Sequence, residues 1–203
     1  MKNKVGLILA ALVFASQAAM AQTLTVSAAI PAATGLTLTV TPVNATTNVF
    51  GTPSTTATTI PFGTLTLNPS LGIYLPTNYY TIGISASGGA GTPIVNVTYT
   101  EGTNPNAPGT STHGLGSKAT ATFLTVNGQT QTVSSLGKKR LIDLTGTAGQ
   151  LATIPFGSYE LVDVGIWSGS TVAPADPTNG EPFSNSDVAG TYTGTLTFTA
   201  VTL

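Results

Sequence analysis

The chain has 203 residues, a formal net charge of −1, a charged fraction of only 6% and no cysteine. Its few cations form no extended cluster, which excludes the phosphate-contacting surface that nucleic-acid binding requires. Without cysteine there can be no disulfide and no thiol chemistry, so packing and hydrogen bonding must supply the stability. The length predicts a single domain.

The first residues have the three parts of a secretory signal peptide. Two lysines precede an apolar run at residues 5–15, and an Ala-Met-Ala sequence ends at Ala21. The apolar run is shorter than the ~20 residues that a membrane-spanning helix needs; a membrane anchor is the alternative for this segment. We predict that residues 1–21 are removed and that the mature chain begins at Gln22, is exported and has no membrane span.

The start of the mature chain has the pattern of a strand. Residues 23–30 alternate between apolar and small polar side chains, as a half-buried strand does. The apolar positions are Leu24, Val26, Ala28 and Ile30. Pro31 ends this run shortly before a second alternating run at residues 36–40. The first run is either the first strand of its own sandwich or a donor strand that completes the sheet of a neighbouring copy.

Further short runs with strand character follow along the chain. They are residues 36–40, 80–84, 95–99, 123–126, 129–133, 141–144, 159–167 and 192–200. Asn127 and Gly128 lie between two of these runs and predict a hairpin, since both turn positions favour positive φ. Long loops are expected at residues 44–59, 102–116 and 168–187. No segment shows helical spacing, so we predict an all-β sandwich or barrel.

The sequence contains few residues that could act as a catalytic base or metal ligand. His113 is the only histidine and has no carboxylate beside it in the sequence. A hydrolase of the triad type needs a base oriented by a carboxylate, and a tetrahedral zinc site needs more His or Cys ligands than this chain has. We therefore predict that the protein is not an enzyme and has no catalytic residues, no cofactor and no metal site.

The acidic residues leave two alternatives open. Asp176, Glu181 and Asp187 share one loop, and calcium takes oxygen ligands of this kind, although the spacing is not that of an EF-hand. A carboxylate pair for glycoside hydrolysis also stays open. Against it, the chain has a single tryptophan. We expect three further acidic residues on outward faces, namely Asp143, Glu160 and Asp163. We expect the basic run on a solvated turn or strand end; it consists of Lys138, Lys139 and Arg140.

The C-terminal residues 187–200, DVAGTYTGTLTFTA, resemble the final strand of archaic chaperone–usher pilins and spore coat protein U-like domains. Members of this group end in a Gly-x-Tyr motif, here Gly190 and Tyr192, followed by alternating threonine and apolar residues. The start of the mature chain is similar too, with an alternating segment, a proline and a second alternating strand. The chain departs from many such pilins in having no cysteine, and it is somewhat long in its loops.

The resemblance implies an incomplete immunoglobulin-like β-sandwich at residues 36–203, preceded by a donor strand and linker at residues 22–35. It also implies a periplasmic chaperone, an outer-membrane usher and donor-strand exchange between copies of the chain. The inserted side chains would be Leu24, Val26, Ala28 and Ile30, and the acceptor groove would be lined by Leu196, Phe198 and Ala200.

The expected function is therefore that of a structural subunit of an extracellular pilus or fimbria, which supports adhesion or biofilm formation. The alternative is a monomeric, secreted carbohydrate- or surface-binding β-sandwich. Such a module would bind its ligand with residues 168–187, together with Trp167 and Phe183.

Overall fold

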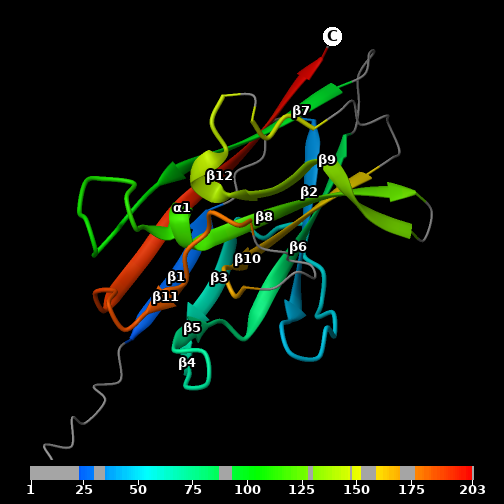
Figure 1. Ribbon diagram of the computed structural model, residues 1–203. Coiled ribbons are helices and arrows are strands. Elements are labelled where there is room, and N and C mark those ends of the chain that lie inside the picture. The colour runs from blue at the N-terminus through cyan, green and yellow to red at the C-terminus, as the bar shows by residue number, and fades with distance from the viewer. Residues whose placement is uncertain are drawn as a thin grey trace, which may run out of the picture.

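The computed structural model describes residues 23–29, 35–86, 93–127, 130–146, 148–151, 159–169 and 177–202. Two main β-sheets, here called sheet A and sheet B, pack against each other, and a small third sheet lies beside them (Figure 1). The prediction of an all-β, sandwich-like fold is confirmed. No helix in this described part of the chain is long and apolar enough to cross a membrane.

Sheet A has four strands and sheet B has five. The order in sheet A is β3 (Thr59–Thr64), β1 (Leu24–Ala29), β12 (Gly190–Thr202) and β7 (Pro93–Glu101). The order in sheet B is β2 (Leu36–Asn44), β6 (Asn78–Ala86), β10 (Tyr159–Ile166), β8 (Ala119–Asn127) and β9 (Thr130–Arg140). The third sheet contains β11 (Phe183–Ser184), β5 (Ile73–Leu75) and β4 (Thr66–Asn68). Two short helices, α1 (Leu115–Lys118) and a 3₁₀ helix (Leu141–Asp143), lie between strands.

The core lies between sheets A and B. Alternate residues of the facing strands supply it, because successive side chains of a strand point to opposite faces. Fully buried members from sheet A are Leu24, Val97, Tyr192 and Phe198, and from sheet B they are Ile82, Ile84, Phe123 and Val164. The alternation of threonine with apolar residues in the sequence thus corresponds to the outer and inner faces of the sheets.

Irregular segments cover two of the outer strand edges. Residues 50–54 run back along β2, where Val40 and Ser54 exchange backbone hydrogen bonds of 2.8 and 2.9 Å. Residues 144–146 and 148–151 run along β7 in the same way; the amide of Tyr99 donates to the carbonyl of Leu144 at 2.9 Å. Covering an edge in this way prevents uncontrolled pairing with other chains.

Several local predictions were wrong. Strands β3, β4, β5 and β11 were missed, the last within the predicted loop 168–187, because Pro61 and Gly63 interrupt the first of them and the other three are very short. The run at residues 141–144 forms the 3₁₀ helix rather than a strand. The predicted hairpin is present, since β8 and β9 pair antiparallel, but Asn127 is the last residue of β8, paired with Thr130, and the connecting residues 128–129 lie outside the described residues.

The basic run ends β9, as predicted. Arg140 then folds onto the 3₁₀ helix, where its Nε and Nη2 donate to the two carboxylate oxygens of Asp143 at 3.0 and 2.7 Å. This two-point contact with a cation lowers the pKa of the partly exposed Asp143 carboxyl.

Asp163 lies on the outward face of sheet B, as predicted, but it is buried there. It lies on β10 between Thr81 of β6 and Thr122 of β8, and it is only 4% exposed. The hydroxyl of Thr81 donates to its Oδ1 at 2.7 Å. Burial nevertheless dominates and raises the pKa of Asp163 from 3.8 to about 6, because the charged form loses its hydration.

Because the pKa of Asp163 is raised in the folded chain, the free energy of unfolding should depend on pH. Below pH 4 the carboxyl is neutral in both the folded and the unfolded chain. Between pH 4 and 6 the unfolded chain ionises while the folded chain keeps its proton, so Asp163 lowers the free energy of unfolding as the pH rises, by about 3 kcal/mol in total. Urea unfolding of Asp163→Asn, which keeps the oxygen that accepts from Thr81, should lack this loss. An equal decline in the variant and the native protein would contradict the assignment.

Candidate polymerisation site

The predicted donor strand forms β1, which lies inside sheet A of its own chain. It runs parallel to β12, from Leu24 opposite Gly190 to Ala29 opposite Thr195, and antiparallel to β3 (Figure 1). In Figure 1 the blue β1 lies beside the red β12, so the two ends of the described chain meet in one sheet. Strand β1 therefore has a hydrogen-bonded strand on each edge.

The inward side chains of β1 are buried completely. Leu24, Val26 and Ala28 are at most 1% exposed and belong to the main core, whereas Thr25 on the opposite face is exposed. Ile30, the fourth predicted donor residue, lies outside the described residues. Burial of a Val or Leu side chain stabilises a fold by about 1.5–3 kcal/mol, so these side chains contribute substantially to the core.

The partner strand β3 depends on β1 for its place in sheet A. It pairs with β1 alone within that sheet, and the pairing shifts register between Val26 and Ser27. Opposite Val26 is Gly63, whose φ of 75° is a conformation that glycine adopts without strain. Removal of β1 would leave β3 without a strand partner in this sheet and would open the edge of β12.

The predicted groove residues lie farther along β12. Leu196 and Phe198 are buried in the same core as the donor residues, and Ala200 is partly buried. All three pair across the sheet with β7, whereas β1 pairs with residues 190–195. The side chain that lies in register with Val26 is Tyr192, which was not among the predicted groove residues.

Tyr192 links the β1–β12 pairing to the loops at that end of sheet A. Its ring packs edge to face on Phe183 with a centroid distance of 4.9 Å. Its hydroxyl donates to the carbonyl of Val188 at 2.7 Å and to Oδ1 of Asn106 at 3.0 Å. Burial, together with the nearby Asp187, raises the pKa of Tyr192, so the hydroxyl keeps its proton and remains a donor.

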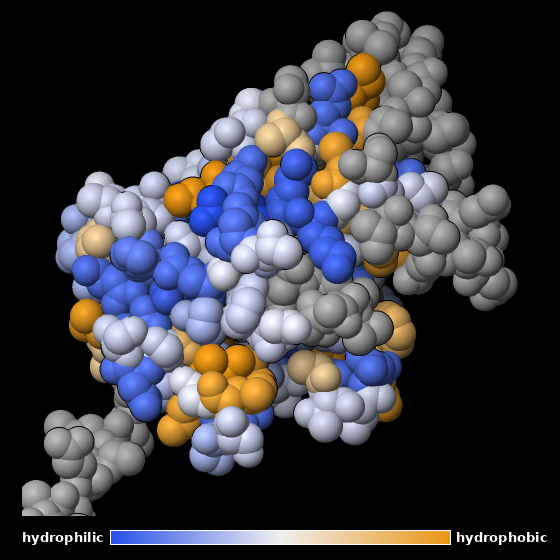
Figure 2. Space-filling view, viewed as in Figure 1, coloured by the Kyte–Doolittle hydropathy of each residue, from blue (hydrophilic) through white to orange (hydrophobic). Residues whose placement is uncertain are grey.

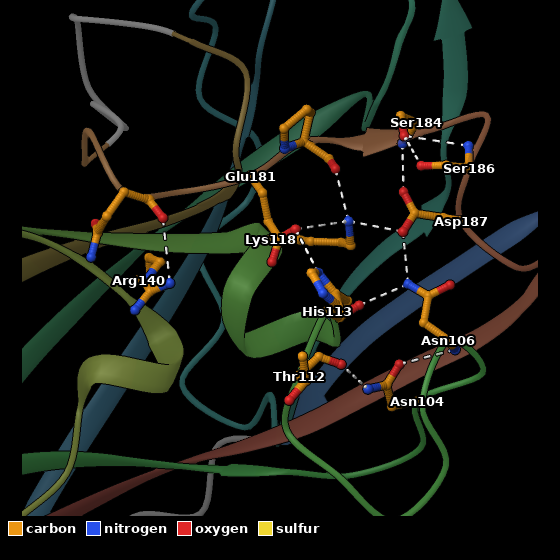
Figure 3. Close-up of polar contacts among 12 residues, drawn as sticks. Asn104, Asn106, Thr112, His113, Lys118, Arg140, Glu181, Ser184, Ser186 and Asp187 are labelled. Carbon is orange, nitrogen blue, oxygen red and sulfur yellow. Dashed lines mark hydrogen bonds and ion pairs between the residues drawn. The ribbon is translucent and has the colours of Figure 1, made fainter.

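A buried ion pair lies next to these contacts (Figure 3). Lys118 Nζ is 2.8 Å from Asp187 Oδ1, and the two side chains are only 4% and 5% exposed. The same ammonium group donates to the carbonyl of Pro182 at 2.9 Å, is 3.9 Å from Glu181 Oε2, and lies 5.2 Å from the centre of the Phe183 ring. Sequence analysis missed this pair, because the partners are far apart in the chain and each looks like a surface residue.

Asp187 has further partners. Nδ2 of Asn106 donates to its Oδ1 at 2.7 Å, and the amide of Ser184 donates to its Oδ2 at 2.6 Å. We call Lys118, Glu181, Asp187, Asn106 and Ser184 the Lys118 cluster. A calcium site that includes Asp187 is not supported, because Lys118 already lies against this carboxylate. Asp176 lies outside the described residues, and within the described ranges no three His, Cys, Asp or Glu side chains gather as metal ligands.

His113 does have a carboxylate partner, contrary to the expectation from the local sequence. Its Nδ1 lies 2.8 Å from Glu181 Oε2, across 68 residues of sequence. The side chain is 61% exposed. Among the hydrogen bonds of the described residues, none joins a hydroxyl group to the imidazole.

The loop proposed for ligand binding in the alternative function is partly inaccessible. Phe183 is fully buried, so the prediction that it could contact a ligand was wrong. Trp167 is partly buried, and its Nε1 donates to the carbonyl of Pro177 at 3.3 Å.

Comparisons with protein-family models, curated proteins and solved structures find no match.

Gly194, which lies in β12 between Ala28 of β1 and Glu101 of β7, provides a test of the packing at this site. A Cβ at this position would come within 2.6 Å of the Cζ atom of the buried Tyr99 ring. Gly194→Ala should therefore lower the free energy of unfolding by about 1–3 kcal/mol. Gly83→Ala is the matched control in another strand, since its Cβ would meet its nearest atoms at 3.7 Å. Equal urea midpoints for the two variants would contradict this account.

Proposed function

We propose that the protein is a structural subunit of an extracellular filament and that its copies join by exchange of β1. The observation that carries the proposal is the position of this N-terminal strand between β12 and β3, with pairing on both of its edges. A chain that releases β1 exposes two strand edges and the pockets of three apolar side chains. The β1 strand of another copy has the correct side chains and backbone groups to fill that space.

The length of β12 supports exchange. Within one chain, β1 pairs only with residues 190–195, because the chain must leave sheet A after Ala29 to begin β2 in sheet B at Leu36. On this side of β12, no strand of the described chain pairs with residues 196–202. A strand donated by another copy has no such connection to the acceptor, so it can continue beside Leu196, Phe198 and Ala200. The exchanged pairing can therefore be longer than the internal one.

The surface is suited to contact between identical copies. Only 6% of the residues are charged, so repulsion between approaching copies is weak. Figure 2 shows a face on which hydrophilic and intermediate residues surround scattered apolar ones. Exposed apolar side chains of the described chain include Val49, Phe50, Leu71 and Val188.

The resemblance of residues 187–200 to archaic chaperone–usher pilins extends the proposal. The sandwich is then an incomplete immunoglobulin-like domain, with residues 22–35 as donor strand and linker. Residues 1–21 direct export, a periplasmic chaperone holds the subunit before assembly, and an outer-membrane usher passes it to the cell surface. The filament supports adhesion or biofilm formation, and the subunit has no catalytic role.

A second candidate function is a monomeric carbohydrate-binding module. The observation in its favour is a hollow of about 330 Å³ on the face of sheet B turned away from the core. Four residues that carry hydroxyl groups, Thr39, Thr41, Thr81 and Ser85, line it together with Gly83 and Leu161. Hydroxyl groups of this kind can bond to a sugar, but an aromatic stacking surface is not among the lining residues.

Complementation with a peptide tests strand exchange directly. A subunit that lacks residues 22–31 should be refolded with a synthetic peptide of these residues. The peptide should bind, raise the melting temperature and give a stable complex that does not polymerise, because it restores both strand pairings and the buried side chains.

Two altered peptides serve as matched controls. Val26→Asp buries an unpaired carboxylate at a cost of several kcal/mol and should abolish binding. Thr25→Asp changes the neighbouring exposed position and should bind nearly as well as the native peptide. The proposal is wrong if both peptides bind equally, or if the complete mature protein shows only monomers by electron microscopy and no filament appears on the source cell.

A further inference from the structure

The Lys118 cluster places an amine and a carboxyl group in direct contact inside the protein. Nζ of Lys118 lies 2.8 Å from Oδ1 of Asp187, and both side chains are almost completely buried. The transfer of one proton from the ammonium group to the carboxylate would give a neutral amine and a neutral carboxylic acid in contact with each other. These are the two reactants of amide formation, and the fold holds them together.

We propose that Lys118 and Asp187 join spontaneously in an intramolecular amide bond and that Glu181 is the catalytic acid–base of this reaction. The proposal goes beyond the filament function and does not depend on it. It assigns a covalent modification to a chain that has no cysteine for a disulfide.

The step balances without any other reactant. After the proton moves from Nζ to the Asp187 carboxyl, the nitrogen lone pair attacks Cγ and forms a tetrahedral intermediate. The Glu181 carboxylate, whose Oε2 is 3.9 Å from Nζ, takes a proton from the nitrogen and delivers it to the leaving hydroxyl group. One water molecule departs, the Nζ–Cγ bond remains, and Glu181 returns to its initial state.

The surrounding donors suit the intermediate. The Asn106 side chain and the Ser184 amide already donate to the carboxyl oxygens of Asp187, at 2.7 and 2.6 Å. Fixed donors of this kind stabilise the negative charge that develops on an oxygen during acyl transfer. His113 holds Glu181 through its Nδ1 contact of 2.8 Å, so it is a positioning residue in this reaction.

The product also fits the site. An amide keeps one N–H on Nζ, which can continue to donate to the Pro182 carbonyl, and one carbonyl oxygen, which can accept from Asn106 or Ser184. Two buried charges disappear from the interior. The bond connects the end of α1 to the loop before β12. A mechanical force applied to β12 would therefore be carried by this bond and not by the chain between Lys118 and Asp187.

Mass spectrometry of the purified mature protein tests the bond. The expected result is a mass lower than that of the sequence by one water molecule, together with a branched proteolytic peptide that joins Lys118 to Asp187. Lys118→Arg keeps the positive charge but cannot form the amide, so it should have the full mass. Cyclisation of an N-terminal glutamine removes ammonia instead of water, and Lys118→Arg would not prevent it.

A comparison of two glutamate variants tests the role of Glu181 as the catalyst. Glu181→Gln should form the bond about 100-fold more slowly or worse after refolding, as expected for loss of a general acid–base. Glu160→Gln, at a partly buried glutamate in β10, should react at the native rate. A native protein with the full mass of its sequence would overturn the proposal, since the pair would then be an ordinary ion pair. A native rate in Glu181→Gln would overturn the assignment of the catalyst.

Discussion

The structure of sheet A depends on the backbone hydrogen bonds that β1 makes on both of its edges. A strand at the border of a sheet can leave and expose one edge, but β1 lies between β12 and β3, so its departure divides the sheet. The same strand fills the core with Leu24, Val26 and Ala28. Because the place of β1 is internal, a sheet A without this strand has two unpaired edges and an open core, and the strand could come from the same chain or from another copy.

The loops at the end of sheet A strengthen this dependence. Tyr192 lies in register with Val26 and bonds through its hydroxyl to Asn106, which in turn bonds to Asp187 of the Lys118 cluster. The position of β12 is therefore coupled to a buried ion pair with several hydrogen bonds. A buried pair of this kind stabilises only while all of its members are present. A covalent bond between Lys118 and Asp187 would fix the loop before β12, whereas it would not bridge β1, the strand that the proposed polymerisation requires to exchange.

Periodicity predicted the strands well where threonine and apolar residues alternate without interruption, as in β1, β2, β7 and β12. Such patterns report directly on the two faces of a strand. It failed at β3, where Pro61 and Gly63 break the pattern and the pairing with β1 decides the structure. It placed Asp163 on an outward face but gave no sign of its burial there, because the burial of one carboxylate depends on the strands on both sides of it. The Lys118 cluster could not be predicted, since it is assembled from loops that are distant in the sequence, and neither could the partnership of His113 and Glu181.

One engineered disulfide would decide which copy supplies β1. Thr25 and Thr191 are register partners in β1 and β12 with exposed side chains, and the natural chain has no cysteine to interfere. Parallel neighbours of this kind lie close enough for a disulfide. Polymerised Thr25→Cys, Thr191→Cys protein, oxidised and examined on a denaturing gel without reductant, should give a ladder of covalent multimers if strands are exchanged. Internally bridged monomers alone would show that each chain keeps its own β1 and would contradict the account.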